Sequence, residues 1–205
     1  GYDINRLNTD LKNPDDHQKY LLDWLPESRQ WSYTLGTTFK HYGNNWYHFF
    51  VLSRSGLYNK VEKYTGNDRH NPKTIDYRSG ESENKFRFEH HRYAANGFKL
   101  QVGAGIEYAH YDNTTARRLF TAGEAIDQYY SRALNMWKWA VFGQVSRSFF
   151  SERLALSLGL RADGCNYTGK TAALYRQISP RFSFSYAFDE RWSLNGNIGR
   201  YYQLP

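Results

Sequence analysis

The sequence predicts an all-β protein, an antiparallel meander of about eight long strands that is a segment of a transmembrane β-barrel. Three observations lead to this prediction: apolar and polar residues alternate along several stretches, tight turns separate the stretches, and short and long connections follow one another in turn. A period of two residues is that of a β-strand, whose side chains point to opposite faces in turn. The clearest example has one leucine at every second position: Leu154, Leu156, Leu158 and Leu160 alternate with Ala155, Ser157, Gly159 and Arg161.

A second stretch repeats the pattern with aromatic residues. Its large side chains are Phe182, Phe184, Tyr186 and Phe188, and its intervening residues are Arg181, Ser183, Ser185 and Ala187. A soluble sandwich would bury such an apolar face in a core. An outer-membrane barrel would turn it toward lipid and keep the polar face toward a wet lumen.

Composition favours the barrel over a helical membrane protein. The 205 residues include 18 Tyr, 13 Phe and 6 Trp but only 5 Pro, and the mean hydropathy is -0.81. No window approaches the roughly 20 apolar residues that a helical span needs, whereas a barrel strand needs apolar residues only at alternate positions. Cys165 is the single cysteine, so the sequence offers no disulfide framework and no thiolate metal site.

Charge and motifs argue against nucleic-acid binding and catalysis. The formal net charge is +7, but the basic residues are spread singly and form no block. The adjacent His90 and His91 would point to opposite faces of a strand and cannot chelate one metal ion. No Gly-x-Ser-x-Gly motif is present. We therefore expect no enzyme, and no catalytic, cofactor-binding or metal-binding residue.

The alternating stretches give the expected strands, each long enough for the roughly 9 to 11 residues that cross a bilayer at a tilt. Residues 1–29 are expected to be a lead-in that resembles an extracellular loop, and residues 30–205 to hold the barrel strands. The strands are expected at 30–42, 46–60, 84–94, 98–111, 136–149, 153–164, 177–188 and 191–202.

The connections between these strands alternate in length. The tight ones fall at 43–45, 95–97, 150–152 and 189–190, and the long ones at 61–83, 112–135 and 165–176. Asn96-Gly97 is a strong hairpin signal because a type I′ turn requires positive φ. Barrels of the outer membrane have short periplasmic turns and long extracellular loops. Tryptophans near the strand ends, such as Trp46, Trp137 and Trp192, would suit an interfacial aromatic girdle.

The stretch 112–135 is the expected ligand-binding loop, because binding residues concentrate on loops carried by a rigid wall. It combines cations and aromatic rings that could hold an anionic chelate or stack on a sugar: Arg117, Arg118, Tyr129 and Tyr130. Taken singly, each of these residues is better explained by packing of loop on loop. Residues Ala116 to Ala133 also have partly helical spacing, which predicts a short surface helix.

The C-terminal third resembles a known family. Ser179-Pro180-Arg181 precedes the alternating aromatics, Trp192-Ser193-Leu194 follows the turn, and the chain then reads Gly199-Arg200-Tyr201-Tyr202-Gln203-Leu204-Pro205. Together with Leu158-Gly159-Leu160-Arg161-Ala162-Asp163 and its partner stretch Phe142-Gly143-Gln144, these residues resemble the barrel of TonB-dependent outer-membrane receptors. The resemblance covers the chain from about Met136 onward, and upstream only the strand rhythm agrees.

The resemblance implies a section of barrel wall from the bacterial outer membrane. Receptors of this family have a plug domain, a TonB-box peptide and about 22 strands, none of which is complete in this chain. The implied function is binding and TonB-coupled uptake of a bulky nutrient such as a metal chelate, cobalamin or glycan. The implied partners are outer-membrane lipid, the remainder of the barrel and its plug, and TonB through that plug. The alternatives are a complete small barrel, adhesive or structural, and a soluble all-β carbohydrate-binding domain.

Overall fold

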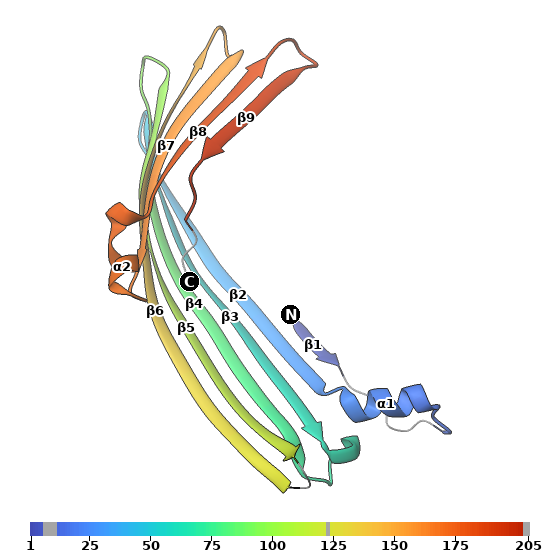
Figure 1. Cartoon of the computed structure of the whole chain (residues 1–205). Coiled ribbons are helices and arrows are strands. Elements are labelled where there is room, and N and C mark those ends of the chain that lie inside the picture. The colour runs from blue at the N-terminus through green and yellow to red at the C-terminus, as the bar shows by residue number, and fades with distance from the viewer. Residues whose placement is uncertain (6–11, 122–123, 203–205) are drawn as a thin grey trace. The chain divides into compact units, whose positions relative to one another are not determined.

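The computed structural model describes residues 1–5, 12–121 and 124–202, and most of them lie in one meander of strands (Figure 1). The nine strands form one sheet in sequence order, and the register of every strand pair described residue by residue is antiparallel. The strands are β1 (Tyr2–Asn5), β2 (Glu27–Tyr42), β3 (Trp46–Tyr64), β4 (Lys73–Tyr93), β5 (Phe98–Thr121), β6 (Glu124–Phe149), β7 (Leu154–Cys165), β8 (Ile178–Ala187) and β9 (Ser193–Gly199). The all-β meander that the sequence predicts is thereby confirmed.

Four short helical segments accompany the strands: α1 (Asp16–Trp24), η1 (Thr65–Asn67), α2 (Gly169–Ala172) and η2 (Leu174–Arg176). Helix α1 begins with a capping box, in which the Asp15 carboxylate accepts a hydrogen bond from the Gln18 N–H at 2.7 Å and the Gln18 side chain accepts from the Asp15 N–H at 3.0 Å. Within the described residues, no helix is both long and apolar enough to cross a membrane.

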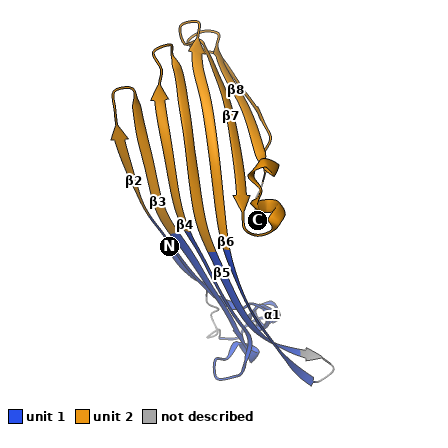
Figure 2. Cartoon of the chain, turned by 90° about the vertical axis from the view of Figure 1, so that its left-hand side faces the viewer, with its two compact units in different colours: residues 1–35, 55–83, 110–135 blue, residues 36–54, 84–109, 136–205 orange. Residues whose placement is uncertain are grey.

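The chain divides into two compact units (Figure 2). Unit 1 comprises residues 1–35, 55–83 and 110–135, and unit 2 comprises residues 36–54, 84–109 and 136–205. Strands β2 to β6 contribute residues to both units, whereas β7, β8 and β9 belong to unit 2 alone.

The tight connections lie together at one end of unit 2 (Figure 2). They join β2 to β3, β4 to β5, β6 to β7 and β8 to β9, as the sequence predicts. Gly97 takes a φ of 83° in the second of these turns. The third turn is unusual, because Phe150, Ser151 and Glu152 all have positive φ, of 55°, 53° and 70°. Non-glycine residues adopt this left-handed conformation only at an energetic cost.

Two of the three long connections are much shorter than the sequence predicts. Strand β3 continues to Tyr64 and β4 begins at Lys73, so the segment 61–83 is mostly strand. Likewise, β5 reaches Thr121 and β6 begins at Glu124, so residues 112–121 and 124–135 are strand, and the surface helix expected over 116–133 is wrong for these described residues. Apolar alternation ends in these stretches, but a strand with polar groups on both faces needs no such alternation, and their Thr and Tyr residues favour extended backbone. Only the third connection, 166–177, holds as a long loop.

The N-terminal region is also more structured than a loop-like lead-in. Strand β1 pairs with β2 in a register that sets Tyr2 opposite Trp31, and β2 already begins at Glu27. The sheet consequently has nine strands where eight were expected.

The register of β6 to β9 in unit 2 separates an apolar from a polar face. Directly opposite residues of an antiparallel pair share a face. One row across the four strands is apolar: Val145, Leu158, Phe182 and Ile198. The next row, on the other face, is polar: Ser146, Ser157, Ser183 and Asn197. This arrangement is the one that the alternation predicts.

The apolar face is exposed and has no core beneath it. The side chains of Leu158 and Ile198 are 59% and 73% exposed. Among the described residues, only two apolar side chains are buried, Met136 and Cys165. A soluble sandwich would cover its apolar face with a second sheet, so this burial pattern is that of a wall that presents its apolar face to lipid.

Candidate functional site

The polar side of unit 2 carries a charged cavity of about 430 Å³ between β3 and β7. Its charged lining residues come from four neighbouring strands: Lys85 and Arg87 from β4, Glu107 from β5, Lys138 from β6, and Arg161 and Asp163 from β7. Alternation places one of them at every second position of a strand, so that Lys85 and Arg87 share a face, as do Arg161 and Asp163. The meander thus assembles a charged surface from residues that lie far apart in the sequence.

The charges on this surface are paired within the wall. Glu107 lies 3.4 Å from the Lys85 Nζ and 3.5 Å from the Lys138 Nζ. Arg161 binds Asp163 two residues along its own strand, with Nε 2.9 Å from Oδ2 and Nη2 2.7 Å from Oδ1. Two donors that engage one carboxylate fix both side chains in orientation as well as in charge.

Phe142 lies at the centre of the cavity wall. The guanidinium carbons of Arg87 and Arg161 lie 5.1 Å and 5.8 Å from its ring centroid, within cation–π distance. A Cβ atom at Gly103 would lie 2.4 Å from the Phe142 Cζ and 2.6 Å from the Phe88 carbonyl oxygen. The ring therefore occupies the space that the missing side chain of Gly103 leaves open.

A second polar cluster surrounds Glu89 on β4, whose side chain is almost fully buried. Its carboxylate accepts a hydrogen bond from the Gln101 Nε2 at 2.8 Å, lies 2.6 Å from the His91 Nε2 and forms an ion pair with Arg87. The His91 ring stacks on Tyr47, with centroids 4.2 Å apart and planes inclined by 9°. Because each polar group has a partner, the burial of Glu89 is compensated.

Within the described residues, no group of three or more His, Cys, Asp or Glu side chains is arranged to hold a metal ion. The arrangement on the polar side is a rigid surface of paired charges and aromatic rings. Such a surface can bind some solutes and exclude others. Its paired carboxylates and cations stabilise one another.

The four residues expected to bind ligand lie on strands and are split between two faces. Arg117 and Arg118 are adjacent on β5, and Tyr129 and Tyr130 are adjacent on β6, so each pair points to opposite faces. Arg118 donates from Nε and Nη2 to Asp127 at 2.6 Å and 2.7 Å, and Tyr129, two residues beyond Asp127, shares that face. The side chain of Tyr129 is 70% exposed. The structure thus brings Arg118 toward Tyr129 and leaves Arg117 and Tyr130 on the other face.

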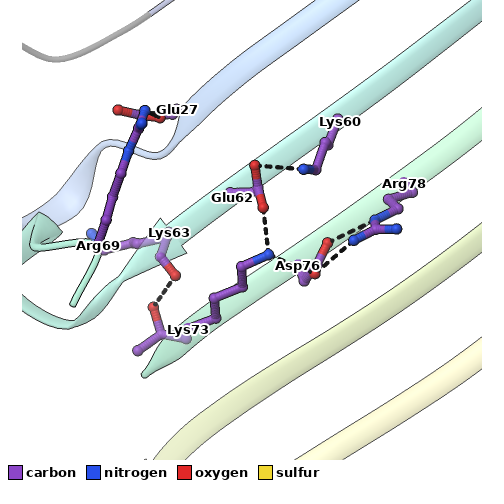
Figure 3. A network of polar contacts seen from close by, with 9 residues as sticks. Glu27, Lys60, Glu62, Lys63, Arg69, Lys73, Asp76 and Arg78 are labelled. Carbon is purple, nitrogen blue, oxygen red and sulfur yellow. Dashed lines mark hydrogen bonds and ion pairs between the residues drawn. The ribbon is translucent and has the colours of Figure 1, made fainter. Parts of the chain in front are cut away.

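The sequence reading missed a charged network on the strands of unit 1 (Figure 3). Glu62, almost fully buried, pairs with Lys60 at 2.8 Å and with Lys73. Lys73 also lies 3.0 Å from an Asp76 oxygen, and Asp76 accepts from the Arg78 Nε at 3.1 Å. The sequence carries a pattern that could have predicted this network. Opposite charges lie two residues apart, Lys60 with Glu62 and Asp76 with Arg78, and residues at that spacing share a strand face.

Comparisons with known proteins agree with the fold and the two-faced wall. The family described as TonB dependent receptor-like, beta-barrel, matches residues 1–205. None of the curated protein sequences matches the chain. Among solved structures, the outer membrane transporter YddB from Escherichia coli aligns with a TM-score of 0.59 at 16% identity, over 86% of this chain and 26% of that one.

Two further solved structures show the same fold. The siderophore receptor PiuA from Acinetobacter baumannii aligns with a TM-score of 0.56 at 12% identity, over 85% of this chain and 32% of the receptor. The RagAB peptide transporter aligns with a TM-score of 0.52 at 10% identity, over 88% of this chain and 23% of the transporter chain. The chain thus spans about a quarter to a third of the transporters it matches. It belongs to the family of TonB-dependent receptor β-barrels, which are receptors of the bacterial outer membrane.

Proposed function

We propose that this chain is a section of barrel wall from a receptor that binds a bulky nutrient and takes it up across the outer membrane with energy delivered by TonB. The observation that carries the proposal is the separation of faces in β6 to β9, where exposed Leu158 and Ile198 lie on one side and a serine row on the other. The apolar face meets lipid and the polar face lines the lumen. A metal chelate, cobalamin and a glycan are the nutrient classes that such a receptor would carry.

The wall needs partners on both sides. Among the described residues, β1 and β9 each have a neighbouring strand on one side only, and unpaired strand edges are not tolerated in the hydrocarbon layer. We infer that the remainder of the barrel pairs with both, and that the plug domain occupies the lumen and contacts TonB. Uptake of this kind requires no covalent chemistry, so we assign no catalytic residue and no cofactor.

We place the membrane around unit 2. Its strand segments 46–54, 84–93 and 98–109 have about the length of 9–11 residues that a tilted strand needs to cross a bilayer. On the tight-turn side, the Trp46 ring lies 4.6 Å from the His48 ring between centroids, and the His90 ring lies 5.1 Å from that of His48. Amphipathic rings of this kind suit a membrane interface. The tight turns then face the periplasm.

Thiol labelling tests this orientation. His70 lies in the connection between β3 and β4 with its side chain 95% exposed, whereas Asn96 lies in a tight turn. In intact cells, a membrane-impermeant maleimide is expected to label a His70→Cys variant and to leave an Asn96→Cys variant unlabelled until the outer membrane is opened. Cys165 is fully buried and should add little background. Labelling of Asn96→Cys in intact cells would contradict the proposed orientation and indicate the reverse one.

We further propose that ligand contacts lie in the segment around Arg117 and Tyr130, which we expect to be extracellular. Combined replacement of Arg117, Arg118, Tyr129 and Tyr130 by Ala is expected to weaken nutrient binding to whole cells. The barrel should stay inserted, because an exposed ion pair such as Arg118–Asp127 contributes only about 0–1 kcal/mol. Titration of bound nutrient, beside surface labelling as an insertion control, measures both effects.

A matched control replaces Lys19 and Tyr20, an exposed cation and aromatic residue on α1, and should bind normally. Normal nutrient binding by the fourfold variant would move the ligand site to other extracellular segments or to the plug. Uptake that persists in cells without TonB would contradict the proposed function itself.

A further inference from the structure

A row of aromatic side chains crosses one face of unit 1. Tyr2 of β1 lies directly opposite Trp31 of β2, and residues so paired share a face. The Trp31 ring stacks in turn on Tyr58 of β3, with centroids 4.5 Å apart and planes inclined by 13°. Tyr2 and Trp31 are 70% and 46% exposed. Trp31 also stacks on Tyr33 of its own strand, with centroids 5.6 Å apart and planes inclined by 23°. Three strands therefore present a fixed aromatic platform, with the rings of Tyr2 and Trp31 exposed to solvent.

A cavity of about 380 Å³ adjoins this platform. Gly80 of β4 lies beside Tyr58, and a Cβ at Gly80 would stand 2.7 Å from the Asp112 Oδ1 and 3.4 Å from the Tyr58 ring. The missing side chain thus leaves room on the sheet surface, and the Asp112 carboxylate reaches over it. The volume is within the range of about 300–1,000 Å³ that small-molecule sites occupy.

Three cations border the same cavity: Arg29, Lys60 and Arg78. Lys60 pairs with Glu62 and Arg78 with Asp76 (Figure 3), which holds both side chains in place. Asp76 accepts from Nε and Nη2 of Arg78, and a guanidinium has five N–H donors, so donors remain for an anion. The Arg78 side chain is 61% exposed.

The same contacts keep Asp76, the carboxylate that pairs with Arg78, ionised. Burial raises the pKa of Asp76, but hydrogen bonds from Lys73 and Arg78 outweigh it and lower the pKa overall. Both groups of the Asp76–Arg78 pair are consequently ionised at neutral pH, and Arg78 stays oriented toward the cavity border.

We propose that this cavity binds a saccharide that carries a phosphate or carboxylate group. A sugar ring packs against the exposed parts of Trp31 and Tyr2, the anionic group meets Arg29 and Arg78, and Asp112 accepts a hydroxyl hydrogen bond. Aromatic platform, cations and one carboxylate acceptor are the three contacts that such a ligand requires together. This proposal does not rest on nutrient transport.

The saccharide could be membrane-anchored, as in the phosphorylated sugars of lipopolysaccharide, or free in the medium. The experiment therefore uses two probes on the assembled receptor in zwitterionic detergent: purified lipopolysaccharide and a soluble phosphorylated mannan oligosaccharide. Each is compared with its enzymatically dephosphorylated form, and inorganic phosphate is measured alone. Dissociation constants are obtained by thermophoresis.

Wild-type receptor is expected to bind at least one phosphorylated probe roughly fivefold or more tightly than its dephosphorylated form. Trp31→Ala and Arg78→Ala should each weaken that binding by about fivefold or more, and Trp31→Phe, which keeps an aromatic ring, should retain most of it. Trp24→Ala removes an exposed tryptophan of α1 outside the cavity and should bind as wild type. Assembly of every variant is verified first, because a correctly folded barrel stays folded in detergent that has not been heated.

Binding of lipopolysaccharide alone assigns the membrane-anchored source, and binding of the soluble oligosaccharide alone assigns the free one. Binding of both supports the shared chemistry. Equal affinity of wild type and Trp31→Ala for both probes, equal affinity for phosphorylated and dephosphorylated forms, or binding of neither probe would overturn the proposal.

Discussion

Replacement of Leu158 by Arg is expected to cost about 2–4 kcal/mol of barrel stability and to deplete assembled receptor in the outer membrane. Leu158 lies in the middle of β7, between Val145 and Phe182 on the apolar face, with 59% of its side chain exposed. A guanidinium there would enter hydrocarbon without a partner. The loss is measured as the folded fraction in outer-membrane extracts. The folded form is the one that stays folded in detergent without heating.

Ser157→Arg is the matched control, one residue away and on the opposite face. Ser157 lies beside a cavity of about 430 Å³ lined largely by small polar residues such as Ser183 and Asn197, so an arginine fits in a wet lumen. Equal damage from the two substitutions would contradict the assignment of faces. Leu158→Ala adds a second test, because it costs about 2–5 kcal/mol in a packed protein core but much less against lipid.

Gly103→Ala is expected to destabilise the wall by about 1–3 kcal/mol, because the added methyl group has no space. It would lie 2.6 Å from the Phe88 carbonyl oxygen, a backbone atom of the neighbouring strand, as well as 2.4 Å from Phe142. A shift of the denaturant midpoint for the receptor refolded in lipid vesicles reports the change.

Gly105→Ala supplies the comparison on the same strand face. Its nearest neighbour would be the Phe86 carbonyl oxygen at 3.5 Å, an ordinary contact, and its stability should stay near that of wild type. Trimming Phe142 to Ala should rescue Gly103→Ala only in part, since the clash with the Phe88 oxygen remains. If Gly103→Ala and Gly105→Ala were equally stable, the prediction would be wrong. Phe142 and β4 would then shift to accommodate the added methyl group without loss of stability.

The sequence predicts unit 2 well because its strands have one apolar and one polar face. Alternation from Leu154 to Leu160 fixes the faces of β7, and the Asn96-Gly97 turn fixes a hairpin. In unit 1 the same reasoning fails, because residues such as Thr114 and Ser131 are polar on the strand faces and leave no apolar period to detect. Their pairing depends on the neighbouring strand, which local patterns do not encode.

The candidate sites were predictable to a smaller extent. Clustering along the sequence singled out Arg117 and Arg118, but adjacent residues of a strand point apart, and Arg118 is engaged by Asp127. The platform of Trp31 and Tyr58 and the cavity around Phe142 join residues from several strands. Only the register of the sheet brings such residues together. The capping box of Asp15 and Gln18 marks the start of α1 and depends on local sequence alone, but residues 1–29 were expected to be a loop-like lead-in and this helix was missed.

The paired charges of the polar wall have a consequence for any ligand that meets it. Lys85 and Lys138 share Glu107, and Arg161 holds Asp163, so each of these three cations lies beside one of two carboxylates of the same wall. A ligand that touches the wall therefore meets fixed, close pairs of opposite charge with a small positive excess, and the wall attracts it mainly at short range.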